Sequence, residues 1–576
     1  MVWKFILLAF TAQPIPANDA FGYDGAVVNY LLNGHYCNPS LAIPFPFSGT
    51  RIFCIYPPLY QAVLFLWMSV FGPTVLSAMW FHLVLFGLFL LTLLAIFRRL
   101  QTPAWAVNLA GLFLFGITFD DRPDGLAQLL GMLALYAWLR SVEPPARTQW
   151  TWLAAVLVVL TLCTNPEIGG LYFGLVWLLT LWTAWRTGRF PFAPMGFLVL
   201  APLALVALVK YGRPDLWAGF LEHAGQTSSF TNLRRPSPGD LLKLVRTIPA
   251  ILLIAPLLLK FPFQRLNLST FQPAVPVGGV PQVSQPAVTP IAQSAGPAEV
   301  GRVRWSNGLR VGKPAIQQTG KSAVRGKSPS SSTTTERPAF NVSTFQPVNA
   351  PTLLFSAVLA SLGLTVGALF LFTSNWILFL AYFQPLIVGL FLLPELLPTI
   401  RADRWLVPAL LGLALLVAVR AMGLTTWGVA CAWDVNEAAA LQIVRADLDK
   451  LPPQATVVMS SAYLYEAMKH PGLTCLHEDW THPNRPDADA GGLTGDAVAL
   501  LKLKPAALIL TQFDYYRRYC DPKADTLTQL RGLPDRVTFK TTNYARVPVP
   551  DASPRFRQVV QHVAWAPVIV EFDWKP

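Results

Sequence analysis

The 576-residue chain is 53% hydrophobic and 13% charged, whereas an ordinary soluble domain carries about 25% charged residues. Its hydrophobicity comes in repeated blocks of roughly 17 to 25 residues, the length of a membrane-spanning helix. The formal net charge of +13 is scattered through short loops, so topology and lipid phosphate explain it better than a nucleic acid, and no nucleic-acid partner is expected. The composition therefore indicates a multi-pass α-helical protein in contact with a lipid bilayer.

The first apolar run, Val2 to Ala12, would form a helix of about 16 Å, whereas the hydrocarbon core of a bilayer is about 30 Å thick. The run could be the hydrophobic part of a signal peptide, but no convincing small-residue cleavage site follows it. We therefore expect it to be the tail of a first membrane span, completed by about ten further apolar residues encoded in frame upstream of Met1.

The first long polar interruption runs from Asp19 to Tyr60. It gathers acidic, aromatic, histidine and arginine side chains just before the apolar sequence resumes. We expect an outer loop over residues 13–60 that carries the chemistry of the protein.

The apolar run Leu59 to Phe71 is too short to span comfortably, and we expect it to lie along the membrane face or dip into it. Together with the truncated first helix, the predicted spans number about eleven. The remaining candidate spans are Val75–Phe97, Ala104–Phe119, Gly125–Leu139, Trp150–Cys163, Ile168–Trp185, Gly196–Tyr211, Ile248–Phe261, Thr352–Phe372, Trp376–Leu397 and Trp405–Cys431.

Positive charge in short loops predicts the orientation of these spans, because such loops are retained in the cytoplasm. The arginines that mark alternate loops as cytoplasmic are Arg98, Arg99, Arg140, Arg147, Arg186, Arg189, Arg401 and Arg404. The opening polar stretch and the loops at 120–124, 164–167 and 212–247 then face outward. The last of these is also basic, with Arg234 and Arg235 among its cations, and an anionic ligand there would account for the exception.

The composition of residues 264–350 changes to Pro, Ser, Thr, Gln and Gly with few aromatic residues, which cannot bury enough apolar surface to fold. A near-repeat brackets the segment, NLSTFQP from Asn267 and NVSTFQP from Asn341. We interpret it as a disordered cytoplasmic insert rather than a docking segment. It separates a membrane module over 1–263 from further membrane helices over 351–431.

Residues 432–576 alternate a helical pattern with strand-like runs such as ATVVMSS, PAALILT and VIVEFDW. This pattern predicts a small α/β domain on the periplasmic face of the inner (plasma) membrane. It has no glycine-rich phosphate loop, so a nucleotide site is not expected.

The cysteines fit an oxidising compartment, where Cys37 could pair with Cys54 and Cys475 with Cys520. Six unpaired thiols are an equally open alternative. No Cys/His spacing typical of zinc occurs, so no metal site and no cofactor are predicted, although a divalent metal stays open.

Asp19 and Asp24 lie near the predicted membrane surface, where carboxylates are either solvated loop charge or functional. Glu167 is as well explained by a charge at a helix N-terminus as by a ligand. His223 lies on an amphipathic helix, where a structural role competes with a catalytic one. Tyr23 could be an interfacial aromatic residue.

Two sets of residues resemble membrane glycosyltransferases of the GT-C superfamily, in the branch of the protein O-mannosyltransferases and the lipid A aminoarabinose transferases. The first outer loop of that family is similar to Asp19-Ala20-Phe21-Gly22-Tyr23, Ala26, Leu31, Leu32 and Gly34, followed by Tyr56-Pro57-Pro58-Leu59-Tyr60 and Phe71-Gly72. The second outer loop is similar to Arg122-Pro123-Asp124-Gly125-Leu126-Ala127. The similarity covers most of the membrane part.

The resemblance implies an inverting transferase that moves a sugar from a polyprenyl-phosphate donor to a glycan, lipid or protein acceptor on the outer face. Asp19 would be the base, because a carboxylate is ionised at neutral pH and can take the acceptor proton. Cations would hold the phosphate. The candidates for contact with the substrates are Arg51, Arg122, Arg234, Arg235, Tyr23, Tyr56, Asp124, Glu167 and His223.

Three positions depart from the family pattern: Ala20 replaces an acidic residue, Gly22 an arginine, and Tyr56 a histidine or lysine. Asp24 is a second candidate catalytic carboxylate that would compensate for Ala20. The departures keep a non-catalytic scaffold with the same fold as an alternative. A transporter or flippase of a lipid-linked glycan is a further alternative, but the ionisable groups concentrate in loops rather than within spans.

Overall fold

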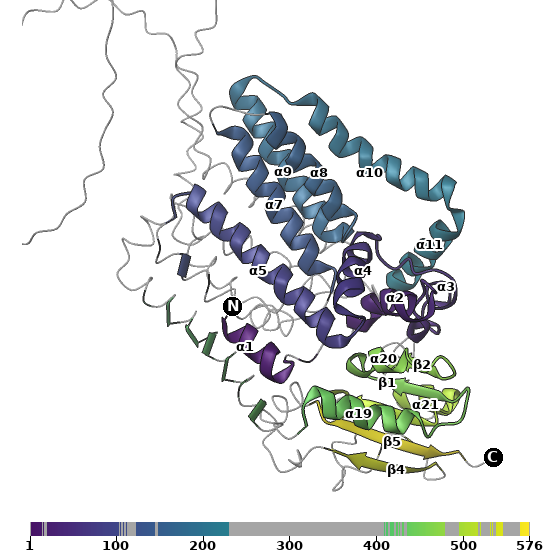
Figure 1. Cartoon of the computed structure of the whole chain (residues 1–576). Coiled ribbons are helices and arrows are strands. Elements are labelled where there is room, and N and C mark those ends of the chain that lie inside the picture. Colours follow the sequence, from purple (N-terminus) through teal and green to yellow (C-terminus); the bar gives the residue numbers. More distant parts are fainter. Residues whose placement is uncertain are drawn as a thin grey trace, which may run out of the picture. The chain divides into compact units, whose positions relative to one another are not determined.

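The structure is a computed structural model (Figure 1). It describes residues 2–13, 15, 20–102, 104, 107–108, 111, 122–143, 148–229, scattered positions over 408–430, 435–478, 495–515, 519, 530, 533, 537–544 and 565–574. The segment at 264–350 lies outside these residues, and so do the predicted spans at 248–261, 352–372 and 376–397. The predicted spans at 104–119 and 405–431 lie mostly outside them.

Four helices of the described part are long and apolar enough to cross a membrane. They are α5 (Val75–Arg99), α7 (Asp124–Val142), α9 (Pro166–Thr187) and α10 (Phe192–Gly212). A fifth apolar helix, α8 (Thr148–Leu162), is shorter. The predicted spans within this region are confirmed as helices, each with bounds within a few residues of those expected, because apolar length and flanking polar residues fix both ends.

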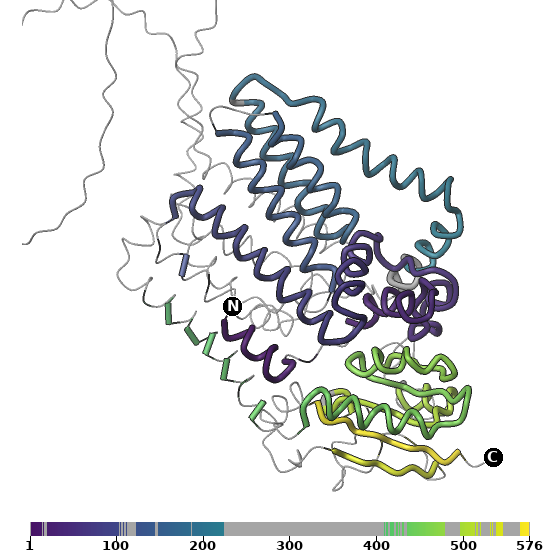
Figure 2. The backbone as a smooth tube through the Cα atoms, in the orientation of Figure 1, coloured from purple at the N-terminus to yellow at the C-terminus, as the bar shows by residue number. Residues whose placement is uncertain are grey.

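Helices α5, α7, α8 and α9 pack side by side (Figures 1 and 2). Gly131 of α7 permits the close contact with α9, because a Cβ atom there would collide with the ring of Tyr172. The Tyr172 hydroxyl donates to Gln128 Oε1 at 3.0 Å, so this buried polar pair is satisfied within the bundle.

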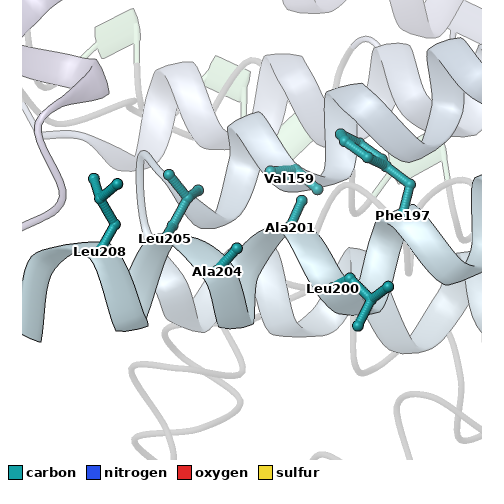
Figure 3. Close-up of a pocket in the computed structure, with 7 residues that line it drawn as sticks. All are labelled: Val159, Phe197, Leu200, Ala201, Ala204, Leu205 and Leu208. Atoms are coloured by element: carbon teal, nitrogen blue, oxygen red, sulfur yellow. The ribbon is translucent and has the colours of Figure 1, made fainter. Parts of the chain in front are cut away.

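Helix α10 packs on α8 and leaves most of its apolar side chains exposed. A wholly apolar groove of about 560 Å³ lies along the two helices, with Val159 contributed by α8 and the rest by α10 (Figure 3). The other lining residues are Phe197, Leu200, Ala201, Ala204, Leu205 and Leu208. Such a surface is stable where lipid chains replace water.

The opening segment, predicted as an outer loop over 13–60, is folded into short helices. After the ten-residue helix α1 (Val2–Thr11), it forms α2 (Ala20–Asn33), η1 (Pro39–Leu41) and α3 (Pro46–Thr50). The Asn38 side chain donates to the Phe21 and Gly22 carbonyls at 2.8 and 3.3 Å and thereby fastens the loop to α2. Its first ten residues are buried, so α2 is an internal element.

Two further helices complete this region. Helix α4 spans Leu59–Phe71, the range predicted from the sequence. Helix α11 (Pro214–Ser229) follows α10 and packs on α3. The opening segment also contains Cys37 and Cys54, which are free thiols, so of the two alternatives left open for this pair the unpaired thiols hold. Cys475 is also free, and Cys520 lies outside the described residues.

The C-terminal domain (residues 432–576) contains a five-stranded sheet in the order β2-β1-β3-β5-β4, which confirms the predicted α/β domain. Strands β1 (Thr456–Met459), β2 (Thr474–His477) and β3 (Ala507–Thr511) are parallel. Strands β4 (Thr538–Asn543) and β5 (Pro567–Asp573) add an antiparallel edge. Within its described residues, the helices of the domain are α19 (Glu437–Leu448), α20 (Ser461–Ala467), α21 (Gly495–Leu503) and α22 (Gln512–Asp514).

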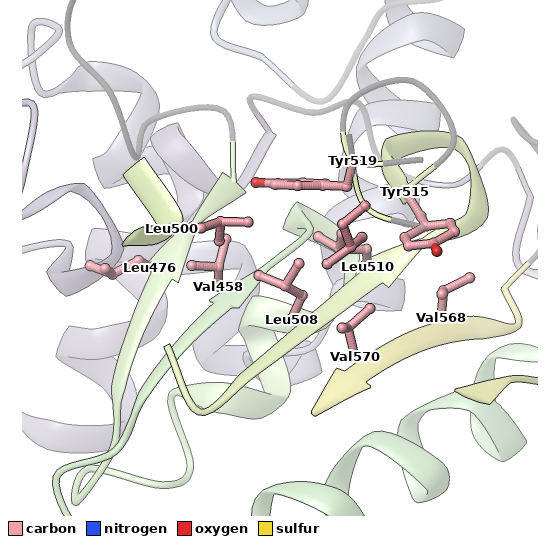
Figure 4. Close-up of a cluster of buried hydrophobic side chains, with 10 residues drawn as sticks. Val458, Leu476, Leu500, Leu508, Leu510, Tyr515, Tyr519, Val568 and Val570 are labelled. Carbon is pink, nitrogen blue, oxygen red and sulfur yellow. The ribbon is translucent and has the colours of Figure 1, made fainter. Parts of the chain in front are cut away.

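One hydrophobic cluster holds this sheet together (Figure 4). Val458, Leu508 and Val570 come from three adjacent strands, and Leu500 of α21 packs on them. At the carboxyl end of the parallel strands, buried polar side chains pair with one another: Ser461 Oγ lies 2.6 Å from His477 Nε2. These pairs satisfy groups that would otherwise be costly to bury.

Candidate functional site

Tyr23 of α2 and Arg122, which directly precedes α7, come together in space although 99 residues separate them. The Arg122 guanidinium donates from Nη2 to the Tyr23 hydroxyl at 3.2 Å and lies 5.4 Å from the centre of the Tyr23 ring. Only 15% of the Arg122 side chain is exposed. A largely covered guanidinium, which is always charged, is a strong candidate for binding an anion.

Asp124 also pairs with Arg122, with 3.5 Å between Oδ2 and Nε. Asn165 fixes Asp124 in turn, because its side-chain amide donates to Asp124 Oδ1 at 2.7 Å. The Asn165 oxygen also accepts from the backbone N–H groups of Glu167 and Ile168, so the same side chain is the N-cap of α9. One buried residue thus starts a long apolar helix and orients the partner of Arg122.

Glu167 is exposed in the first turn of α9, within electrostatic range of Asp124 and Arg122. The described part of this cluster therefore carries one cation and two carboxylates. The N-termini of α7 and α9 both lie here, and the positive ends of their dipoles offset part of the acidic charge.

Aromatic contacts extend the cluster to α11. The Tyr56 ring lies 5.2 Å from the Tyr23 ring and 6.2 Å from the His223 ring, and His223 also contacts Phe45 at 5.1 Å. Burial lowers the pKa of His223 to about 4, so its imidazole is neutral at pH 7. His223 therefore adds an aromatic face rather than a second cation.

Arg122, Tyr23, Asp124, Glu167, Tyr56 and His223 are hereafter called the Arg122 cluster. All six were singled out from the sequence, and the structure brings them together. Arg51 instead lies exposed at the end of α3, with its guanidinium 5.8 Å from the centre of the Phe47 ring. Asp19, Arg234 and Arg235 lie outside the described residues.

Asp24, for which the sequence left open a solvated loop charge or a functional carboxylate, is fully buried in α2. Its two carboxylate oxygens accept from tyrosine hydroxyls: Tyr60 donates to Oδ1 and Tyr465 to Oδ2, both at 2.7 Å. Behind Tyr60, His82 Nε2 lies 3.0 Å from the same hydroxyl. With both oxygens so engaged and no exposed surface, Asp24 is placed to hold elements together rather than to contact an acceptor.

Sequence reasoning missed Asn165, Tyr60, His82 and Tyr465. For Asn165 a signal was present, because Asn-Pro-Glu before an apolar run is a typical helix start, with proline at the first helical position. Tyr60 was noted only within the resemblance, and no local pattern connects it with Tyr465, 405 residues later.

The cluster offers a positioned guanidinium, carboxylates and aromatic faces, groups suited to a phosphorylated sugar or lipid headgroup. Within the described ranges, no group of three His, Cys, Asp or Glu side chains could hold a metal ion. No protein-family model matches the chain, and no curated protein matches it significantly.

Proposed function

We propose that the protein is an integral membrane glycosyltransferase. It transfers a sugar from a polyprenyl-phosphate donor to a glycan, lipid or protein acceptor on the outer face of the membrane, with inversion at the anomeric carbon. Asp19 takes the proton of the acceptor hydroxyl, and Arg122 stabilises the phosphate leaving group.

The observation that carries this proposal is the environment of Arg122. The guanidinium is largely covered, held by Tyr23 and Asp124, and located at the start of two helices long enough to cross a membrane. A donor whose apolar chain lies in the bilayer would present its phosphate near the ends of such helices. The residues that carry the family resemblance in two separate loops, Tyr23, Arg122 and Asp124, are also the ones in contact.

The structure bears on two of the departures from the family pattern, at Tyr56 and at Ala20, for which Asp24 was the candidate substitute. Tyr56 occupies the place of a cation in the family, and here its ring packs between Tyr23 and His223. The phosphate therefore depends more heavily on Arg122, supplemented by Arg234 and Arg235 of the basic loop. Asp24 is not a substitute base, because its oxygens already bind two tyrosines.

The test uses the purified full-length protein with a radiolabelled polyprenyl-phosphate sugar and an extract of envelope acceptors. Transfer of the label together with release of polyprenyl phosphate supports the proposal. Binding of the donor without release supports the non-catalytic scaffold. In proteoliposomes, movement of intact donor across the bilayer would instead support the transporter.

A further inference from the structure

The C-terminal domain docks on the opening helix through a buried carboxylate. Besides the Tyr465 hydroxyl on Asp24, the Tyr465 ring lies 4.8 Å from the Phe21 ring. The Asn33 side chain donates to the Met468 carbonyl at 3.2 Å. Helix α2 is therefore held by α20 at its first, second and last turns.

The titratable groups around Asp24 come from α4, α5 and α20, and η1, which also packs on α2, contributes none. Helix α4 provides Tyr60, with His82 of α5 behind it, and α20 provides Tyr465. The charged neighbour of Tyr465 is Glu466, which is already paired with Arg445 and Lys469 at 2.7 Å each. On α2 itself, Tyr23 holds Arg122. Among the described residues, the direct hydrogen-bond donors to the Asp24 side chain are therefore neutral tyrosine hydroxyls.

We propose that Asp24 makes the docking of the C-terminal domain on α2 dependent on pH, with the docked arrangement favoured when this carboxyl is neutral. Undocking would remove Tyr465 and admit water to the carboxylate, whereas docking buries it completely. Burying an ionised carboxylate is costly, and two hydroxyl donors offset only part of that cost.

The direction follows from proton linkage. Burial raises the pKa of Asp24 from its ordinary 3.8 to about 7, although the Tyr60 and Tyr465 hydroxyls lower it. Because the docked carboxyl binds its proton more tightly than a hydrated one, its contribution to docking is fully present below the ordinary value. That contribution is lost as the pH rises through about 7.

This docking is independent of the chemistry of the protein, but its consequence for catalysis rests on the proposed function. Tyr23, the residue next to Asp24, provides the contact that positions Arg122. Loosening α20 from α2 would therefore disturb the Arg122 cluster through one intervening peptide bond.

The test is hydrogen–deuterium exchange of the full chain in lipid nanodiscs from pH 5.5 to 8.5, corrected for intrinsic exchange. Peptides covering α2 and α20 should lose protection by up to about tenfold per pH unit as the pH rises from 5.5 to about 7, and protection should level off above pH 7, where the carboxyl is ionised whether docked or not. Asp24→Asn keeps the shape and stays neutral, so protection should become independent of pH. Asp449→Asn is the matched control: its side chain is 61% exposed on the same domain, and it should behave like the unmodified protein.

Tyr465→Phe provides a second measurement should Asp24→Asn fold poorly. Removing a donor from the carboxylate makes the Asp24 side chain harder to ionise, so the pH at which protection levels off should move to a higher value. Protection that does not change with pH in the unmodified protein, or that still changes in Asp24→Asn, would overturn the inference. The inference would also be overturned if protection levelled off at the same pH in Tyr465→Phe as in the unmodified protein. None of these readouts requires sugar transfer, so failure here is distinct from failure of the proposed function.

Discussion

At the scale of single residues, Arg122 decides whether the Arg122 cluster binds an anion. Its replacement by alanine removes the fork that matches phosphate oxygens and takes away the cation beside Asp124. We expect Arg122→Ala to weaken donor binding and to lower kcat/KM by roughly 100- to 1,000-fold, as for other losses of a transition-state donor. Lipid-donor binding and turnover should be measured together.

Arg189→Ala is the matched control for Arg122→Ala, because Arg189 is an exposed arginine in the turn between α9 and α10. It should leave both quantities within about twofold, since isolated surface charges contribute little. Equal losses in the two variants would argue against a phosphate site at Arg122.

A second prediction for a single residue concerns Asp19, the proposed base. Asp19→Asn keeps the size of the side chain and removes the charge that accepts a proton, so donor binding should persist. Turnover should fall by roughly 100- to 10,000-fold, the loss typical of a general base. Single-turnover transfer at saturating donor measures this. If Asp24→Asn abolished transfer while Asp19→Asn did not, the base would be Asp24 and the present assignment would be wrong.

At the scale of secondary-structure elements, Asn165 joins two functions that can be separated. Asn165→Ser keeps an oxygen that caps α9, so the loss in the free energy of unfolding should be limited to the lost hydrogen bond to Asp124, about 1.5–3 kcal/mol. The shorter side chain cannot reach Asp124, and a lost hydrogen bond to a charged group should reduce turnover roughly 10- to 100-fold. A fall in thermal midpoint with unchanged turnover of the folded protein would mean that Asn165 acts only as a cap.

The contact between α7 and α9 depends on the small size of Gly131. Gly131→Ala would push a methyl group into the Tyr172 ring and should destabilise the protein by about 1–3 kcal/mol. Gly196→Ala in α10 is the control, because apart from the adjoining backbone of α10 no atom lies within 4 Å of the position that the added methyl group would take, and alanine favours a helix. Thermal unfolding in detergent compares the two, and equal midpoints would contradict the packing described for α7.

At the scale of the whole molecule, the sequence pattern predicts that the C-terminal domain and the insert at 264–350 face opposite sides of the membrane. A cysteine replacing exposed Asp449 should react with an impermeant maleimide added from outside. A cysteine replacing Ser330 should react only after the membrane is opened. Labelling of both sites from the same side would refute this topology.

Much of the fold was predictable because its signals are local. Apolar length defines α4 and α5, and strand-like runs define β1 and β3. Strand β2 was missed, since Thr-Cys-Leu-His is only four residues long and half polar. The six residues of the Arg122 cluster were proposed one at a time from motifs and polarity.

What no local signal could provide is the environment of each residue. Asp24 looks like any loop carboxylate in the sequence, and its burial results from α4 and α20, elements that lie at very different distances from it along the chain. The same holds for the free thiols of Cys37 and Cys54, which compartment and spacing made equally compatible with a disulfide.

The long-range contacts of the opening segment also constrain how the protein is made. Tyr465 lies 441 residues after Asp24, and the Trp565 indole donates to the Ala12 carbonyl across 553 residues. At about 5–20 residues per second, the ribosome needs roughly 20 to 90 s to synthesise the chain between Asp24 and Tyr465. Throughout that interval the face of α2 that packs on α20 lacks its partner, so a nascent chain that stalls before Tyr465 should be a preferred substrate for chaperones and membrane proteases.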